Sequence, residues 1–116
     1  STSWQIIQGV FEAGAIEVHF LISSPPIQFP DFYGIDTPLQ KDLIASQKTV
    51  EEIREFLGAT SLYYLSLDGL IASTGLSRDQ FCMACFTGEY PIDLRERAGD
   101  FKKPAFSERL LSSKAA

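Results

Sequence analysis

The 116-residue chain has the length of one domain, and its 45% hydrophobic and 22% charged residues exclude wholesale disorder. No apolar run approaches the roughly 18 residues of a membrane span, so we expect a cytoplasmic protein without membrane contact. The net charge of −5 argues against a nucleic-acid partner, which a basic surface would indicate.

Helices and strands are expected to alternate from the start of the chain. Apolar residues at helical spacing predict a helix over Trp4–Ala13 with Ser3 as its N-cap, and alternation predicts a strand over Glu17–Ile22. A helix followed by a strand is half of a βαβ unit, so we expect its first strand upstream and a chain cut from within a domain. His19, the only histidine, has no obvious partner nearby and is expected to be a half-buried spacer.

The middle of the chain combines an irregular loop with further helix and strand signals. Four prolines in Ser23–Pro38 exclude a helix or an inner strand and predict a long, aromatic-rich loop that is either functional or packed against the domain. The expected later elements are a short helix near Gln40–Ala45, a helix from the Thr49–Glu52 capping box to Gly58, a strand over Ser61–Ser66, a helix from Ser66 to Gly75 and a second capping box at Ser77–Gln80.

Charge divides the chain near residue 92. Residues 1–92 carry four Lys and Arg against eleven Asp and Glu, whereas residues 93–116 carry six against four. We therefore separate a folded part, residues 1–92, from a basic C-terminal tail, residues 93–116, and interpret the tail as a solvated extension.

The only two cysteines, Cys82 and Cys85, are spaced C-x2-C ahead of a Gly turn and a Pro. Two thiolates at this spacing suit a metal, an iron–sulfur cluster or a redox disulfide, and the pair alone does not decide among them, because a metal or cluster normally needs four ligands. A thiol–disulfide exchanger is disfavoured, because the pair lies between Phe81 and Phe86 with no adjacent base.

Six motifs, in this order, together resemble the C-terminal part of the amidophosphoribosyltransferase family. The resemblance runs from Ser1 to about Pro91, and the order is far more specific than any one motif. The motifs are Ser1–Ile7, Glu12–Val18, Ile22–Pro26, Tyr33–Pro38, Val50–Arg54 and Cys82–Pro91.

The resemblance implies an α/β fold: the C-terminal part of a type I phosphoribosyltransferase domain plus a mostly helical C-terminal segment. It implies a glutamine-dependent transferase that delivers ammonia to phosphoribosyl pyrophosphate in the first step of purine synthesis, with Mg²⁺, purine nucleotide inhibitors and a homo-oligomer. Ser1, Thr2 and Ser3 match the end of the family's phosphate loop and would hold the 5-phosphate, in agreement with the anion preference of a helix N-terminus.

The family's paired aspartates and its glutaminase cysteine have no counterpart in this chain, so the chain alone is expected to be inert. An alternative of another class is a free-standing metal-binding or structural module without catalysis.

In cluster-containing members of the family, four cysteines hold a 4Fe–4S cluster. Cys82 and Cys85 match two of them, one would lie outside this chain, and Asp31 stands where the fourth is expected. Either Asp31 completes a three-Cys, one-Asp site, or the cluster is lost and the cysteines persist as small buried residues or bind zinc. A cluster would tie the proline-rich loop around Asp31 to the segment at Cys82.

Overall fold

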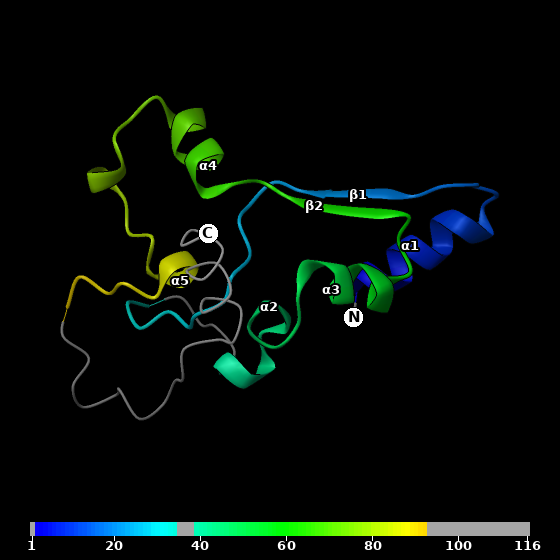
Figure 1. Ribbon diagram of the computed structural model, residues 1–116, viewed down its shortest axis with the longest axis horizontal. Helices are drawn as coiled ribbons and strands as arrows, with labels where there is room; N and C mark the ends of the chain where they lie inside the picture. The colour runs from blue at the N-terminus through cyan, green and yellow to red at the C-terminus, as the bar shows by residue number, and fades with distance from the viewer. Residues whose placement is uncertain (1, 35–38, 93–116) are drawn as a thin grey trace, which may run out of the picture.

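Two short parallel strands connect the two halves of the molecule (Figure 1). The structure, a computed structural model, describes residues 2–34 and 39–92. Strands β1 (His19–Ile22) and β2 (Ser61–Tyr64) pair from His19↔Ser61 to Ile22↔Tyr64. The basic tail and Ser1 lie outside the described residues.

The connection between the strands is long enough for the crossover that a parallel pair requires. Besides the proline-rich loop, its described residues form one 3-10 turn and two α-helices. These are η1 (Gln40–Asp42), α2 (Ile44–Gln47) and α3 (Val50–Leu57). The single helix predicted over Gln40–Ala45 is divided in two, because Leu43 adopts an extended backbone between η1 and α2.

The hydrophobic core lies between the sheet and the helices α1 (Thr2–Glu12) and α3, which are on the same side of the strands in Figure 1. Its buried members come from α1, α2, α3, the turn after α3 and β2. They are Ile7, Ala45, Ile53, Leu57, Ala59 and Leu62. Phe20 and Ile22 of β1 face this core, whereas Leu21 is 72% exposed, so the predicted alternation along the strand is confirmed.

Helix α3 begins and ends as its sequence predicts. The Thr49 hydroxyl accepts the Glu52 N–H at 3.2 Å, and the Glu52 carboxylate accepts the Thr49 N–H at 2.7 Å, which completes the capping box. Gly58 ends the helix at φ +71°, a conformation that glycine adopts without steric cost.

Helix α4 (Leu67–Thr74) is capped by the Ser66 hydroxyl and ends at Gly75, as expected. The capping box predicted at Ser77–Gln80 is wrong. Residues Arg78–Gln80 form a single 3-10 turn, η2, in which the Gln80 N–H donates to the Ser77 carbonyl at 3.2 Å. That N–H is therefore already satisfied and does not need the Ser77 hydroxyl.

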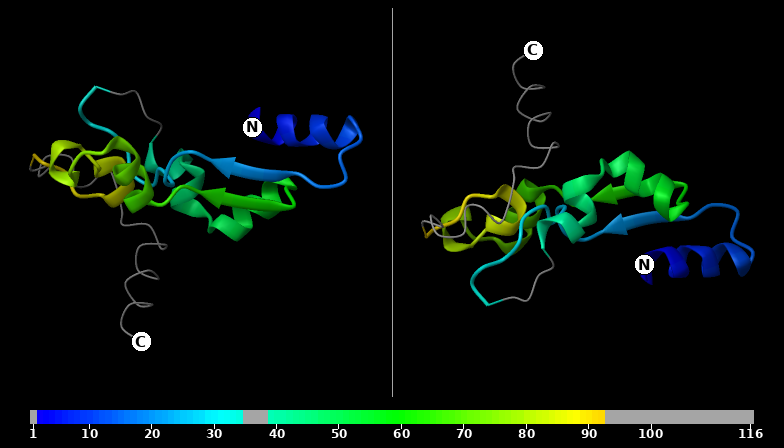
Figure 2. Two further views of the ribbon diagram at one scale, coloured as in Figure 1. Left: turned by 90° about the horizontal axis from the view of Figure 1, so that it is seen from above. Right: turned by 90° about the horizontal axis from the view of Figure 1, so that it is seen from below.

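The last helix among the described residues, α5 (Ala84–Thr87), follows the first cysteine and contains the second. Figure 2 shows α4 and α5 beside the proline-rich loop, at the end of the molecule away from α1. Within the described part of the chain, no helix is long and apolar enough to cross a membrane.

Candidate functional site

The predicted phosphate-binding residues lie at the start of α1, which begins at Thr2, so the prediction of Ser3 as the N-cap is wrong and Ser3 lies within the first turn. Thr2 is exposed and Ser3 is half-buried, whereas Ser1 lies outside the described residues. The first turn of α1 carries no acidic side chain that would repel an anion. The two hydroxyls and the helix N-terminus are thus compatible with a phosphate group.

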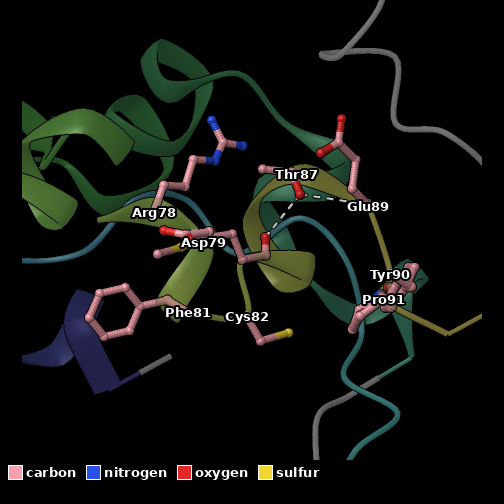
Figure 3. A pocket seen from close by; sticks show the side chains of 9 residues that line it. Arg78, Asp79, Phe81, Cys82, Thr87, Glu89, Tyr90 and Pro91 are labelled. Atoms are coloured by element: carbon pink, nitrogen blue, oxygen red, sulfur yellow. Dashed lines mark hydrogen bonds between the residues drawn. The ribbon is translucent and has the colours of Figure 1, made fainter. Parts of the chain in front are cut away.

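The cysteines lie at the other end of the molecule, beside a pocket of about 500 Å³ (Figure 3). The pocket is made by η2, the segment that follows it and the turn after α5, so its walls come from one continuous stretch of chain. Its lining residues are Arg78, Asp79, Phe81, Cys82, Met83, Thr87, Glu89, Tyr90 and Pro91. The Thr87 hydroxyl donates to the Met83 carbonyl at 3.0 Å and accepts the Glu89 N–H at 3.1 Å, which fixes the turn.

The two thiols differ in their surroundings. Cys82 is exposed, whereas Cys85 is half-buried. Burial raises the pKa of the Cys85 thiol, and the negative charges of Cys82 and Asp31 raise it further. Cys82 and Asp31 therefore lie close enough to the Cys85 thiol to act on it electrostatically.

The proline-rich loop is attached to α5 and the turn after it, an arrangement that we call the loop clasp (residues 28–33 and 84–90). The Cys85 carbonyl accepts the N–H groups of Gln28 and Phe29, each at 3.1 Å. The Tyr90 hydroxyl donates to the Pro30 carbonyl at 2.6 Å. The expectation that this loop packs against the domain is confirmed.

Aromatic rings complete the loop clasp. The Tyr90 ring lies 5.3 Å from the Phe32 ring and 6.3 Å from the Tyr33 ring, in tilted orientations that favour aromatic pairs. Burial is the main cause that raises the pKa of Tyr90 to about 12. Phe29, which is 3% exposed, packs so closely on Gly88 that a Cβ there would lie 2.7 Å from its ring.

The side chains of the loop clasp do not fit a metal cluster by themselves. The Asp31 carboxylate accepts the Tyr33 N–H at 3.0 Å. Among the described residues, no group of three or more His, Cys, Asp or Glu side chains is placed to hold a metal ion. Ligation by Cys82, Cys85 and Asp31 stays a prediction. In this structure, hydrogen bonds and aromatic contacts connect the proline-rich loop to α5 and the turn after it, which is the connection expected of a metal cluster.

His19 is exposed and is not the half-buried spacer that was expected, and it has two polar partners. Its Nδ1 lies 2.7 Å from the Ser61 hydroxyl, and its Nε2 lies 3.1 Å from the Glu17 carboxylate. Ser61 is the residue that faces His19 in the parallel register. Since that register arises from a pairing of residues 42 positions apart, no local pattern could have shown this contact.

Comparisons with known proteins agree with this architecture. The chain is 50% identical to amidophosphoribosyltransferase of Bacillus subtilis over 98 residues and 52% identical to that of Synechocystis over 92 residues. These matches cover 81% and 79% of this chain but 21% and 19% of the relatives. The resemblance to amidophosphoribosyltransferase is confirmed.

A solved structure of glutamine phosphoribosylpyrophosphate amidotransferase from B. subtilis, complexed with ADP and GMP, matches with a TM-score of 0.74 and 47% identity. The match covers 90% of this chain and 23% of that chain, so the α/β phosphoribosyltransferase fold predicted by resemblance is also confirmed. No model of a protein family matches the chain. The chain thus spans about one fifth of the length of the amidophosphoribosyltransferases it resembles.

Proposed function

We propose that the chain is one part of an enzyme that releases ammonia from glutamine and joins it to C1 of phosphoribosyl pyrophosphate. The products are 5-phosphoribosylamine, pyrophosphate and glutamate, and the reaction opens purine synthesis. One observation carries the proposal: the same region matches amidophosphoribosyltransferase at 50% sequence identity and in fold, with a TM-score of 0.74. Because the chain spans about one fifth of such relatives, we infer that it is inert alone.

In this proposal, the N-terminus of α1 holds the 5-phosphate of the substrate. The helix has 11 residues and no acidic side chain in its first turn, so its N–H groups and macrodipole favour an anion. The exposed hydroxyl of Thr2 and the half-buried one of Ser3 would donate to the phosphate oxygens. The role of these residues is to bind and orient the ribose phosphate, which positions C1 for attack.

The family resemblance extends the proposal to Mg²⁺, nucleotide inhibitors and a homo-oligomer. Mg²⁺, when bound, would neutralise charge on the departing pyrophosphate. The described residues form no group placed to hold a metal ion, so this ion would depend on the substrate and on other parts of the enzyme. The ADP and GMP bound in the B. subtilis structure support purine nucleotides as ligands of the whole protein.

The test uses the full-length protein that contains this chain. We expect it to release glutamate from glutamine and pyrophosphate from phosphoribosyl pyrophosphate in equal amounts. Thr2→Val is expected to raise the KM for phosphoribosyl pyrophosphate about tenfold or more, since a hydrogen bond to a charged group contributes roughly 1.5–3 kcal/mol.

Ser73→Ala is the control, because Ser73 is an exposed residue of α4 whose hydroxyl donates only within its own helix, to the Leu70 carbonyl. We expect this variant to keep the normal KM. Absence of pyrophosphate release by the full-length protein would overturn the proposed reaction. An unchanged KM in Thr2→Val would overturn the phosphate assignment alone.

A further inference from the structure

The cysteine pair lies beside a loop that other groups already hold in place. A 4Fe–4S cluster is usually held by four thiolates, and one of the four positions expected from the family resemblance is Asp31 here, whose carboxylate is a harder donor than a thiolate. No third ligand joins the two cysteines within the described residues, and Asp31 uses its carboxylate to accept the Tyr33 N–H. We propose that the loop clasp is metal-free, and that Cys82 and Cys85 remain free thiols that bind neither iron nor zinc.

Backbone hydrogen bonds supply the first part of the attachment. The carbonyl oxygen of Cys85 accepts two N–H donors, those of the buried residues Gln28 and Phe29. Cys85 thus holds the loop through its backbone and not through its sulfur. Because both donors are withdrawn from water, they depend on this carbonyl for a partner.

Side chains supply the second part. The Tyr90 hydroxyl bonds the buried Pro30 carbonyl, and the Tyr90 ring packs against Phe32 and Tyr33. The Phe29 ring fills the space over Gly88. These contacts join the loop to the turn after α5 at several points, which is the task that a cluster ligated by Asp31 and the cysteines would perform.

The metal-free clasp has a chemical consequence for the thiols. Cys82 is exposed and lines the open pocket, so small reagents can reach its sulfur. Cys85 is half-buried, so small reagents reach its sulfur less easily. We expect Cys82 to be alkylated rapidly and Cys85 slowly.

The experiment uses the full-length protein, purified anaerobically. Metal content is measured by elemental analysis, and iodoacetamide labelling of each cysteine is followed by peptide mass spectrometry, with and without a chelator. We expect far less than one iron or zinc per site, and labelling of Cys82 that the chelator does not change. Stoichiometric metal, or labelling of Cys82 that appears only after chelation, would overturn the proposal.

Two variants keep the proposal testable if metal is lost during purification. Tyr90→Phe removes the bond to Pro30, and we expect several-fold faster labelling of Cys85. Tyr63→Phe, which alters a tyrosine that is 66% exposed on β2, is the matched control and should leave the rate unchanged. An unchanged Cys85 rate in Tyr90→Phe would show that the clasp contacts do not hold the loop.

Asp31→Asn discriminates between a metal ligand and a loop residue. The amide oxygen can still accept the Tyr33 N–H, but the carboxylate that a metal would need is gone. We expect the same metal content and the same labelling rates as in the original protein. A loss of metal, or faster labelling of both cysteines, would identify Asp31 as a ligand and refute the metal-free clasp.

Discussion

The two ends of this molecule are stabilised by different means. At one end, α1, α3 and the parallel strands bury aliphatic side chains such as Ile7, Ile53 and Leu62. At the other end, the loop clasp depends on aromatic rings, backbone carbonyls and one tightly packed glycine. The comparison teaches that a proline-rich loop without secondary structure can be held as specifically as a strand, provided that its backbone donors find partners.

The largest effect is expected in the aliphatic end. Ile53→Ala removes a side chain that is 2% exposed, and should lower the stability of α3 by about 4 kcal/mol through lost burial and the cavity left behind. Hydrogen exchange of the α3 amides in the full-length protein measures this change. Exchange in the loop clasp should change much less; an equal loss there would show that the two ends do not unfold separately.

Gly88→Ala should produce the largest effect in the loop clasp, about 3 kcal/mol. The alanine Cβ would strain a backbone at φ +74° and would lie 2.7 Å from the Phe29 ring. Gly75→Ala is the matched control, because its φ is +69° and nothing lies within 4 Å of the added Cβ, so it should lose only about 1 kcal/mol. Hydrogen exchange of residues 28–33 measures the difference in stability loss between the two variants. Equal losses would show that contact with the Phe29 ring contributes nothing to the effect of Gly88→Ala.

Thr49→Ala should weaken the start of α3 by about 1 kcal/mol, because the Glu52 N–H loses its acceptor in the capping box. The change should appear as faster exchange in the first turn of α3 and leave the loop clasp unaffected. Ser73→Ala, within an exposed part of α4, serves as the control. Equal exchange in the two variants would show that the box contributes nothing measurable.

The smallest effect concerns pH. The pKa of Tyr90 is raised to about 12 in the folded chain, mainly by burial, from an ordinary value of 10.0. Between these values the unfolded chain releases the proton more readily, so the stabilisation is complete below about pH 10 and falls as the pH approaches 12. Urea unfolding of the loop clasp at increasing pH should therefore show a steeper loss than in Tyr90→Phe, and parallel curves would contradict this.

Local signals in the sequence predicted the elements better than their contacts. The capping box at Thr49, the Ser66 cap and the glycines at 58 and 75 predicted the bounds of α3 and α4, because these interactions join residues a few positions apart. The same reasoning failed at Ser77, where a 3-10 turn satisfied the N–H that a cap would have used. It also left His19 without a partner: Ser61 reaches it only across the sheet, whereas Glu17, two positions earlier, is a local partner that the reasoning overlooked.

The sequence by itself indicated the resemblance to amidophosphoribosyltransferase, the α/β class and the ends of α3 and α4, because ordered motifs and short-range hydrogen bonds involve residues that are close together along the chain. Only the tertiary structure decided how the loop around Asp31 is held. That attachment joins residues some 60 positions apart, such as Tyr90 and Pro30. Either metal ligation or hydrogen bonding could attach the loop to so distant a segment. The relative placement of the side chains distinguishes the two, and no local sequence pattern contains it.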